Sequence, residues 1–102
     1  MIQEIVVYRI SEEGLPDFLE TRAHLMEELR QLAGFVSEQH SIGLNDRNVR
    51  VDVITWESKE LARSARVAFC ELSYAEAFLK YVDGTPIVEE LFEITEGALP
   101  AA

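Results

Sequence analysis

The chain has 102 residues, 48% of them hydrophobic and 27% charged, which is the composition of one folded domain and not of a disordered segment. Its 19 acidic residues outnumber its 9 basic ones, for a formal charge of −10, and the basic residues are scattered, which argues against nucleic acid and anionic membranes as partners. Cys70 is the only cysteine, so an intrachain disulfide, a cysteine-based zinc site and a CxxC redox motif are excluded.

The sequence contains no apolar run that approaches the ~20 residues of a membrane-spanning helix. The segment from Met1 to Tyr8 lacks the basic start and the small-residue cleavage site of a signal peptide. We therefore expect a cytoplasmic protein that forms a single domain over residues 1–102.

The first expected strand, residues 2–10, carries apolar side chains on both faces, which is typical of a strand that is covered from both sides. After a short loop, Pro16 suits the first position of a helix that runs to Ala33, and Gly34 supplies its stop. The residues expected on the buried face of this helix are Phe18, Leu19, Leu25, Met26, Leu29, Leu32 and Ala33.

A hairpin is expected next, with a strand from Phe35 to Gly43, a loop over 44–48 and a strand over 49–56. A second helix begins at Ser58, which is a good N-cap, and is ended by the Gly and Pro of residues 83–86. The last strand runs from Glu89 to Thr95, and a tail from Gly97 to Ala102.

The second helix carries two apolar stripes, which indicates that it contacts two partners. The expected core stripe is Leu61, Ala65, Ala68, Leu72, Ala75, Leu79 and Val82. The opposite stripe, which favours an interface over a cofactor site, is Val67, Cys70, Tyr74, Phe78 and Tyr81. Ser73 and Glu76 have the spacing of a capping box, so the helix could break there and turn its second half.

The expected order of elements is βαββαβ, which predicts an α+β, ferredoxin-like domain with a four-stranded antiparallel sheet. Two helices can cover only one face of such a sheet, yet the strands over 2–10 and 49–56 are apolar, at least in part, on both faces. A second copy of the chain is the simplest cover for the other face, so the sequence predicts a homodimer.

Trp56 and Asp52 are the first two candidate site residues. They lie on the same face of the strand over 49–56, about 13 Å apart along the backbone, and Asp52 stands where an apolar residue is expected. An indole and a carboxylate on one wall are consistent with a pocket for a small aromatic ligand. The alternative is that Trp56 simply anchors the core at the junction of strand and helix.

Arg22 is the third candidate, because it falls at the centre of the apolar face of the first helix. Its guanidinium could reach solvent at an edge, pair with Asp52 across the space between helix and sheet, or bind an acidic or quinone-like oxygen of a ligand. His40 could be a general base near the pocket or a surface or interface residue. The two histidines, His24 and His40, are too isolated to predict a metal site.

The whole pattern resembles the dimeric α+β barrel superfamily, in particular the antibiotic-biosynthesis-monooxygenase-like domains. The likeness spans nearly the whole chain and rests on three segments, Gly34-Phe35-Val36, the stretch from Asp52 through Trp56 to Ala62, and Phe92-Glu93-Ile94. The resemblance implies the fold of that superfamily and a homodimer.

The resemblance also bears on chemistry. The quinone-forming, cofactor-free monooxygenases of this kind have an Asn four residues before such a Trp, where this chain has Asp52. An ionised carboxylate cannot donate a hydrogen bond to an oxyanion, but it can act as a base toward a phenolic or carbon-acid proton. The haem-degrading relatives use a histidine on the second helix, which this chain lacks, so we expect no haem of that type and no cofactor.

The resulting hypothesis is a cofactor-independent, monooxygenase-like enzyme for a small aromatic or polyketide-type substrate. Trp56 would be the platform, Asp52 the acid–base group and Arg22 an orienting charge. The rival hypothesis is a non-catalytic binding or stress-response module of the same fold. An enzyme needs a lined cavity that a titratable group reaches, whereas a filled core in which Arg22 and Asp52 only neutralise each other would favour the module.

Overall fold

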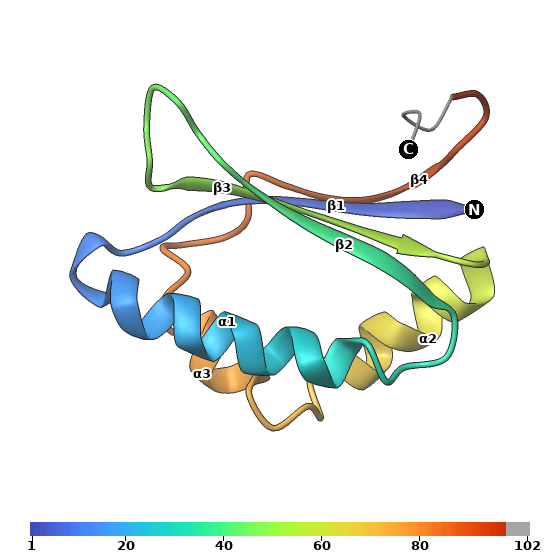
Figure 1. Ribbon diagram of the computed structural model, residues 1–102, viewed down its shortest axis with the longest axis horizontal. Helices are drawn as coiled ribbons and strands as arrows, with labels where there is room; N and C mark the ends of the chain where they lie inside the picture. Colours follow the sequence, from blue (N-terminus) through green and yellow to red (C-terminus); the bar gives the residue numbers. More distant parts are fainter. Residues whose placement is uncertain (98–102) are drawn as a thin grey trace, which may run out of the picture.

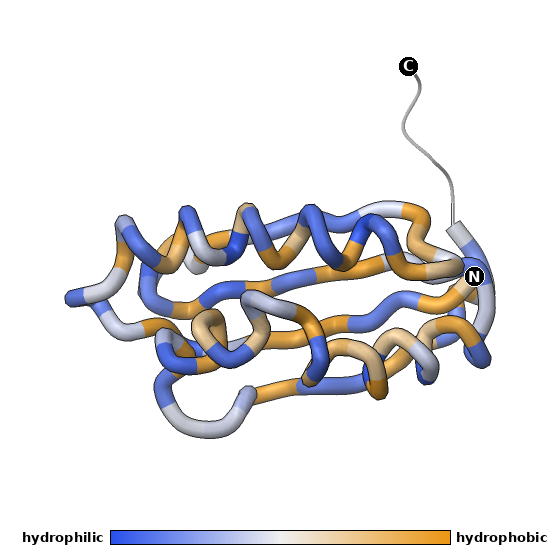
Figure 2. Tube along the Cα trace, turned by 90° about the horizontal axis from the view of Figure 1, so that it is seen from below, coloured by the Kyte–Doolittle hydropathy of each residue, from blue (hydrophilic) through white to orange (hydrophobic). Residues whose placement is uncertain are grey.

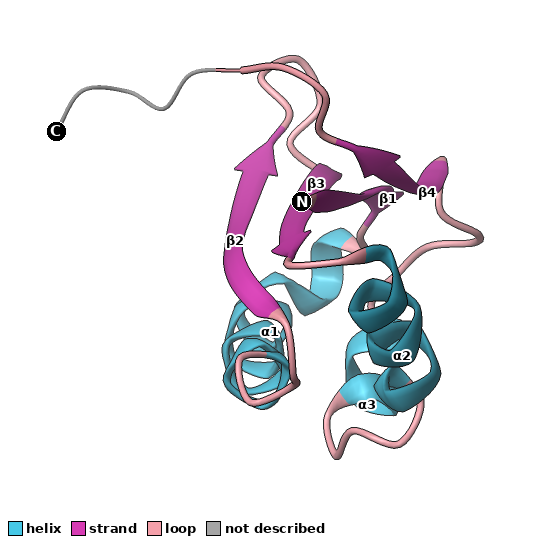
Figure 3. Cartoon of the chain, turned by 90° about the vertical axis from the view of Figure 1, so that its right-hand side faces the viewer, coloured by secondary structure: helices cyan, strands magenta, loops and turns pink. Residues whose placement is uncertain are grey.

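A computed structural model describes residues 1–97 as an α+β domain in which helices cover one face of a four-stranded antiparallel sheet of order β2-β3-β1-β4 (Figures 1 and 3). The predicted fold class and order of elements are confirmed, with the second helix in two pieces. Of the expected tail, only Gly97 lies inside the described residues. The elements are β1 Ile2–Arg9, the 3-10 turn η1 Glu12–Gly14, α1 Leu15–Leu29, β2 Phe35–Ile42, β3 Val49–Trp56, α2 Lys59–Phe69, α3 Ala75–Leu79 and β4 Val88–Glu93.

The core lies between the sheet and the helices. Hydrophilic and hydrophobic residues alternate along strands and helices alike (Figure 2), as expected of elements with one buried and one exposed face. In β3 the alternation is strict, and every second residue from Arg50 to Trp56 is buried. The largest fully buried side chains are Trp56, Tyr8, Phe18 and Leu25.

The helix α1 is shorter than predicted, because residues 30–34 form turns. Phe18, Leu25, Met26 and Leu29 are buried as expected, but the prediction for Leu19 was wrong, since its side chain is 49% exposed. Leu19 follows Phe18 by one residue, which turns it about 100° away from the sheet.

The predicted second helix is interrupted between α2 and α3. The backbone N–H groups of Ser73 and Tyr74 donate to the carboxylate of Glu28 on α1, at 2.8 and 2.9 Å. The expected capping box does not form, because the residue before α3 is Tyr74 and it makes no side-chain cap bond. The break turns α3 so that Phe78 is buried and Leu79 is 51% exposed, which corrects the prediction that Leu79 belongs to the core.

The second sheet face is not covered by any helix among residues 1–97 (Figures 1 and 3). The residues of β1 and β3 that alternate with the buried ones point to this face, and their register pairs Val7 with Val51 and Ile5 with Val53. Val88 and Phe92 of β4 extend the apolar surface and are 38% and 41% exposed. We call these six residues the open sheet face.

Gly34 fixes the connection from α1 to the sheet, and its replacement tests this account of the fold. Its φ is +87°, and a Cβ there would lie 2.6 Å from the Cβ of Leu61. Gly34→Ala should lower the free energy of unfolding by roughly 2–4 kcal/mol, through backbone strain and overpacking together. Gly84, at φ +75° with no neighbour within 4 Å, is the matched control, and Gly84→Ala should cost only the strain of about 1–2 kcal/mol. Equal losses in urea denaturation would contradict the contact with Leu61.

Candidate active site

The site is built around Asp52, a buried carboxylate in the middle of β3. The strand alternation directs it to the helix side of the sheet, where its side chain is 7% exposed. Its Oδ2 accepts a hydrogen bond from the hydroxyl of Tyr8 at 2.7 Å. Its Oδ1 accepts from Arg22 Nη2 at 2.9 Å and from Arg22 Nε at 3.2 Å. The two oxygens therefore face different surroundings, one a phenol and the other a cation.

Arg22 reaches this carboxylate from the apolar face of α1, which answers the question that the sequence left open. Its Nη2 also donates to Glu38 Oε2 at 3.0 Å, and Glu38 in turn accepts from Arg30 at 3.0 Å. The side chain of Arg22 is only 11% exposed. The cation is thus held between two carboxylates on neighbouring strands, which balance its charge and accept hydrogen bonds from Nε and Nη2.

His40 belongs to the same network. Its register partner across the β2–β3 pair is Asp52, and its Nδ1 lies 2.6 Å from Asp52 Oδ1. Arg50 Nη1 lies 3.3 Å from His40 Nε2, and a guanidinium can only donate. Nε2 is therefore the acceptor, and Nδ1 carries the proton that is shared with Asp52.

These contacts set the protonation states. Burial by itself would raise the pKa of Asp52, but the hydrogen bond from His40 and the charge of Arg22 outweigh it, so the pKa lies below its usual value. Burial and the charge of Asp52 raise the pKa of Tyr8 far above that of a free phenol. At neutral pH the pair is therefore a carboxylate and a protonated hydroxyl.

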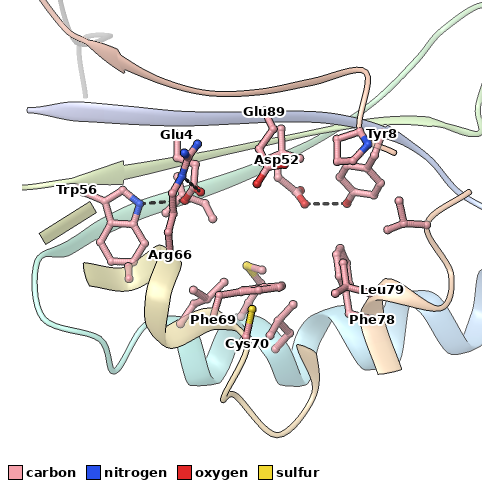
Figure 4. A pocket seen from close by; sticks show the side chains of 18 of the residues that line it. Glu4, Tyr8, Asp52, Trp56, Arg66, Phe69, Cys70, Phe78, Leu79 and Glu89 are labelled. Atoms are coloured by element: carbon pink, nitrogen blue, oxygen red, sulfur yellow. Dashed lines mark hydrogen bonds and ion pairs between the residues drawn. The ribbon is translucent and has the colours of Figure 1, made fainter. Parts of the chain in front are cut away.

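A cavity of about 460 Å³ lies between the sheet and the helices and opens beside this carboxylate (Figure 4). Asp52 and Trp56 both line it, whereas Arg22 and His40 do not. The buried network therefore meets the cavity through Asp52 and its hydrogen-bond donor Tyr8. Other residues that line the cavity include Glu4, Tyr8, Arg66, Phe69, Phe78 and Glu89.

Trp56 is at once a core residue and a wall of the cavity, so the two interpretations of its role are compatible. Its side chain is fully buried, and Phe35 packs against it edge-on with ring centroids 5.9 Å apart. The indole Nε1 donates to Glu4 Oε1 at 3.2 Å, and Arg66 Nε donates to Glu4 Oε2 at 3.4 Å. This forms a second polar cluster on the wall, apart from Asp52.

Solved structures of other proteins share this architecture, although no family profile and no curated protein matches the sequence. SnoaB, a cofactor-independent oxygenase from Streptomyces nogalater, is 18% identical and aligns over 98% of this chain and 97% of that chain with a TM-score of 0.80. An antibiotic biosynthesis monooxygenase aligns at 14% identity over 94% and 100% of the two chains, with a TM-score of 0.74. A protein from Deinococcus radiodurans, assigned provisionally to the same group, aligns over 100% of both chains at 17% identity and a TM-score of 0.77.

The chain has the antibiotic biosynthesis monooxygenase fold. This confirms the resemblance inferred from the sequence. At such identities the likeness establishes the fold, and the chemistry has to be argued from the site of this chain.

Three polar residues that line the cavity were not predicted from the sequence. Glu4 and Tyr8 lie on the buried face of β1, and Glu4 carries the same signal as Asp52, an acid where an apolar residue is expected. Arg66 follows the buried Ala65 by one residue, so it lies beside the core stripe of α2. Periodicity could have found Glu4 and Tyr8, but only the packing of α2 on the sheet brings Arg66 to Glu4.

Two further properties concern the described part of the chain. Residues 1–97 contain no group of three or more His, Cys, Asp or Glu side chains arranged to hold a metal ion. None of the helices in that range is both long and apolar enough to cross a membrane.

The pairing of Arg22 with Asp52 can be measured by a double-mutant cycle. Arg22→Met leaves Asp52 buried with only His40 and Tyr8, and should lower the free energy of unfolding by roughly 3 kcal/mol, the low end for a broken buried pair. Adding Asp52→Asn should recover part of this loss, because the uncompensated charge is gone. Urea denaturation of the wild type, the two single variants and the double variant measures the coupling free energy between Arg22 and Asp52.

The control is the exposed pair of Arg9 and Asp46, whose side chains are 49% and 43% exposed. Arg9→Met should change stability little, since solvent screens that pair. Strictly additive effects of Arg22→Met and Asp52→Asn would show that the two side chains do not interact.

Proposed function

We propose that the protein is a cofactor-independent, monooxygenase-like enzyme that acts on a small aromatic substrate, with Asp52 as its base. The observation that carries the proposal is an ionised carboxylate on the wall of a mostly apolar cavity of about 460 Å³. Cavities of this size and lining are typical of sites for small organic ligands. The shared fold with the cofactor-independent oxygenase SnoaB supports the reaction class.

The protonation states define what Asp52 could do. Because its pKa is low, it is charged at neutral pH and can accept a proton but cannot donate one. A weak base of this kind requires an acidic substrate, such as a phenol or a C–H group that is conjugated with a carbonyl. Tyr8 would hold Oδ2 in place, and His40 and Arg22 would hold Oδ1.

The proposed oxidation takes its electrons from the substrate itself. After Asp52 removes a proton from a CH₂ group that lies between aromatic rings and is conjugated with a carbonyl, the resulting carbanion reduces dioxygen. One oxygen atom becomes a carbonyl oxygen of the product, and the other leaves as water with the two hydrogens that the substrate has lost. The apolar walls, including Phe69 and Phe78, would bind the rings and exclude water from the anion.

The second candidate function is a binding module without catalysis. It is favoured by the number of partners of Asp52, whose oxygens contact Tyr8, Arg22 and His40 at hydrogen-bond distance. Arg22 also balances the charge of the carboxylate. A carboxylate that is so well satisfied can be purely structural. The cavity beside it serves either function, so the two candidates differ only in what Asp52 does.

Asp52→Asn separates them, because it preserves shape and removes the base. We expect the wild-type protein to consume dioxygen in the presence of a hydroxyanthrone or a quinol, and Asp52→Asn to lower kcat at least about 100-fold, as for the loss of a general base. Glu89→Gln is the matched control, since it makes the same carboxylate-to-amide change in an exposed residue of the same cavity, and it should retain activity.

An oxygen electrode and the absorbance of the quinone product give both rates, and circular dichroism checks the fold of each variant. Activity of Asp52→Asn equal to or above that of the wild type would contradict a base and indicate hydrogen-bond donation instead. Tight binding of the aromatic compounds without oxygen uptake by the wild type would favour the binding module.

We also propose that the protein is a homodimer that buries the open sheet face of each copy. This surface is apolar at Ile5, Val7, Val51, Val53, Val88 and Phe92. Exposure of these apolar side chains to water is unfavourable. The same face of a second copy is equally apolar, so the two faces can cover each other. The dimers of the superfamily that this chain resembles are consistent with the proposal.

A charge at the centre of the open sheet face should break this dimer. We expect the wild type to sediment at twice the monomer mass at micromolar concentration and Val51→Lys to shift it to the monomer mass, because a lysine would be buried without a partner. Val67→Lys is the control, since Val67 is 77% exposed on α2, away from that face. A monomeric wild type, or dissociation by Val67→Lys alone, would refute the interface.

A further inference from the structure

Glu4 is a second buried carboxylate on the cavity wall, and it stands where β1 should carry an apolar side chain. Its register partners on the two neighbouring strands are Ile54 and Leu91, and its side chain is only 13% exposed. Oε1 accepts a hydrogen bond from the indole Nε1 of Trp56 at 3.2 Å, and Oε2 accepts one from Arg66 Nε at 3.4 Å (Figure 4). The two oxygens therefore bind donors from two different elements, β3 and α2.

The strand register explains how Glu4 reaches Trp56. Ile54, the partner of Glu4, precedes Trp56 by two residues, so Glu4 and Trp56 are diagonal neighbours on the buried face of the sheet. Such neighbours lie about 7–8 Å apart at their backbones, a separation that a glutamate and an indole together span. The contact is therefore set by the pairing of β1 with β3.

The hydrogen bond to Glu4 uses the only polar atom of the indole ring. Trp56 is fully buried, and Phe35 packs edge-on against it with ring centroids 5.9 Å apart. A buried indole N–H needs an acceptor, and Glu4 supplies it. A donor that is already bound to a carboxylate is not available to a ligand, so the side chain of Trp56 offers only carbon atoms to the cavity.

The wall thus carries two carboxylates, each paired with an arginine from a different helix. Asp52 pairs with Arg22 of α1, and Glu4 pairs with Arg66 of α2. Burying a second acid on an apolar strand face is costly even when an arginine compensates its charge. The presence of Glu4 is explained by what its hydrogen bonds hold in place, which is the ring of Trp56.

We propose that Glu4 is a positioning residue, which fixes the indole ring of Trp56 in the cavity wall and keeps its N–H from binding a ligand. The inference rests on the proposed function in that this wall belongs to the site where Asp52 meets its substrate. The two carboxylates then have separate tasks, since Asp52 removes the proton and Glu4 sets the shape and polarity of the wall. A glutamine can take over the task of Glu4 because its amide oxygen accepts the same hydrogen bond, whereas a leucine cannot.

The first test uses the fact that Trp56 is the only tryptophan in the chain, so a ¹H–¹⁵N NMR spectrum contains a single indole signal. Without ligand, the indole proton of the wild type should exchange with water at least about tenfold more slowly than that of Glu4→Leu, as expected for a hydrogen bond to a charged acceptor. Glu4→Gln should remain within about fivefold of the wild type, since its amide oxygen is a weaker acceptor in the same place. Glu89→Leu is the matched control, because Glu89 is an exposed carboxylate of the same cavity, and it should leave the exchange rate unchanged.

Oxygen uptake with a hydroxyanthrone or a quinol then distinguishes the tasks of the two carboxylates. Glu4→Leu should raise KM at least about tenfold with a smaller change in kcat, because the wall binds the substrate before and during the reaction alike. Glu4→Gln should keep kcat within about threefold of the wild type, in contrast to the loss of a general base.

Two results would overturn the role of Glu4. One is a loss of kcat in Glu4→Gln as large as that in Asp52→Asn, which would make Glu4 a base. The other is equal exchange of the indole proton in the wild type and Glu4→Leu, whatever the activity. Absence of oxygen uptake by the wild type would remove the proposed oxidation, and the exchange rates alone would then decide whether Glu4 positions Trp56.

Discussion

The structure depends on keeping one carboxylate ionised inside an apolar core. Asp52 sits where β3 should carry a hydrophobic side chain, and burial alone would raise its pKa. Arg22 supplies the compensating charge from α1, and Tyr8 and His40 complete the hydrogen bonds from the strands on either side. The ion pair between Arg22 and Asp52 therefore holds α1 against the sheet in addition to apolar packing. Removing either side chain would leave the other as an uncompensated buried charge.

This arrangement divides the interior into two regions with different roles. Arg22, Glu38 and His40 lie behind Asp52 and fix its orientation and charge, while the cavity lies in front of it. A base that is preorganised in this way needs no rearrangement when a substrate loses its proton. The same contacts lower its basicity, so the site suits only acidic substrates.

The sequence predicted those parts of the fold that are local. Strict alternation located β3, and the helical wheel placed Arg22 on the buried face of α1, which left Asp52 as a natural partner. Features that depend on contacts distant in sequence were not predictable. Glu28 of α1 binds the backbone N–H groups of Ser73 and Tyr74 just before α3, and the placement of Arg66 requires α2 to pack against β1. Leu19 was misplaced because one residue of helix rotation separates a buried position from an exposed one.

The pKa of Asp52 is the most direct measure of this account, and it is accessible by NMR titration of its carboxyl carbon. The account predicts a value below the usual ~3.9 in the wild type, because Arg22 and His40 stabilise the charged form. It predicts a rise in Arg22→Met, where burial is no longer offset by the guanidinium. Such a depressed pKa adds stability above the unfolded value, and this stability is lost as the pH falls through the folded one. A wild-type pKa at or above ~3.9, or one unchanged by Arg22→Met, would contradict the central claim.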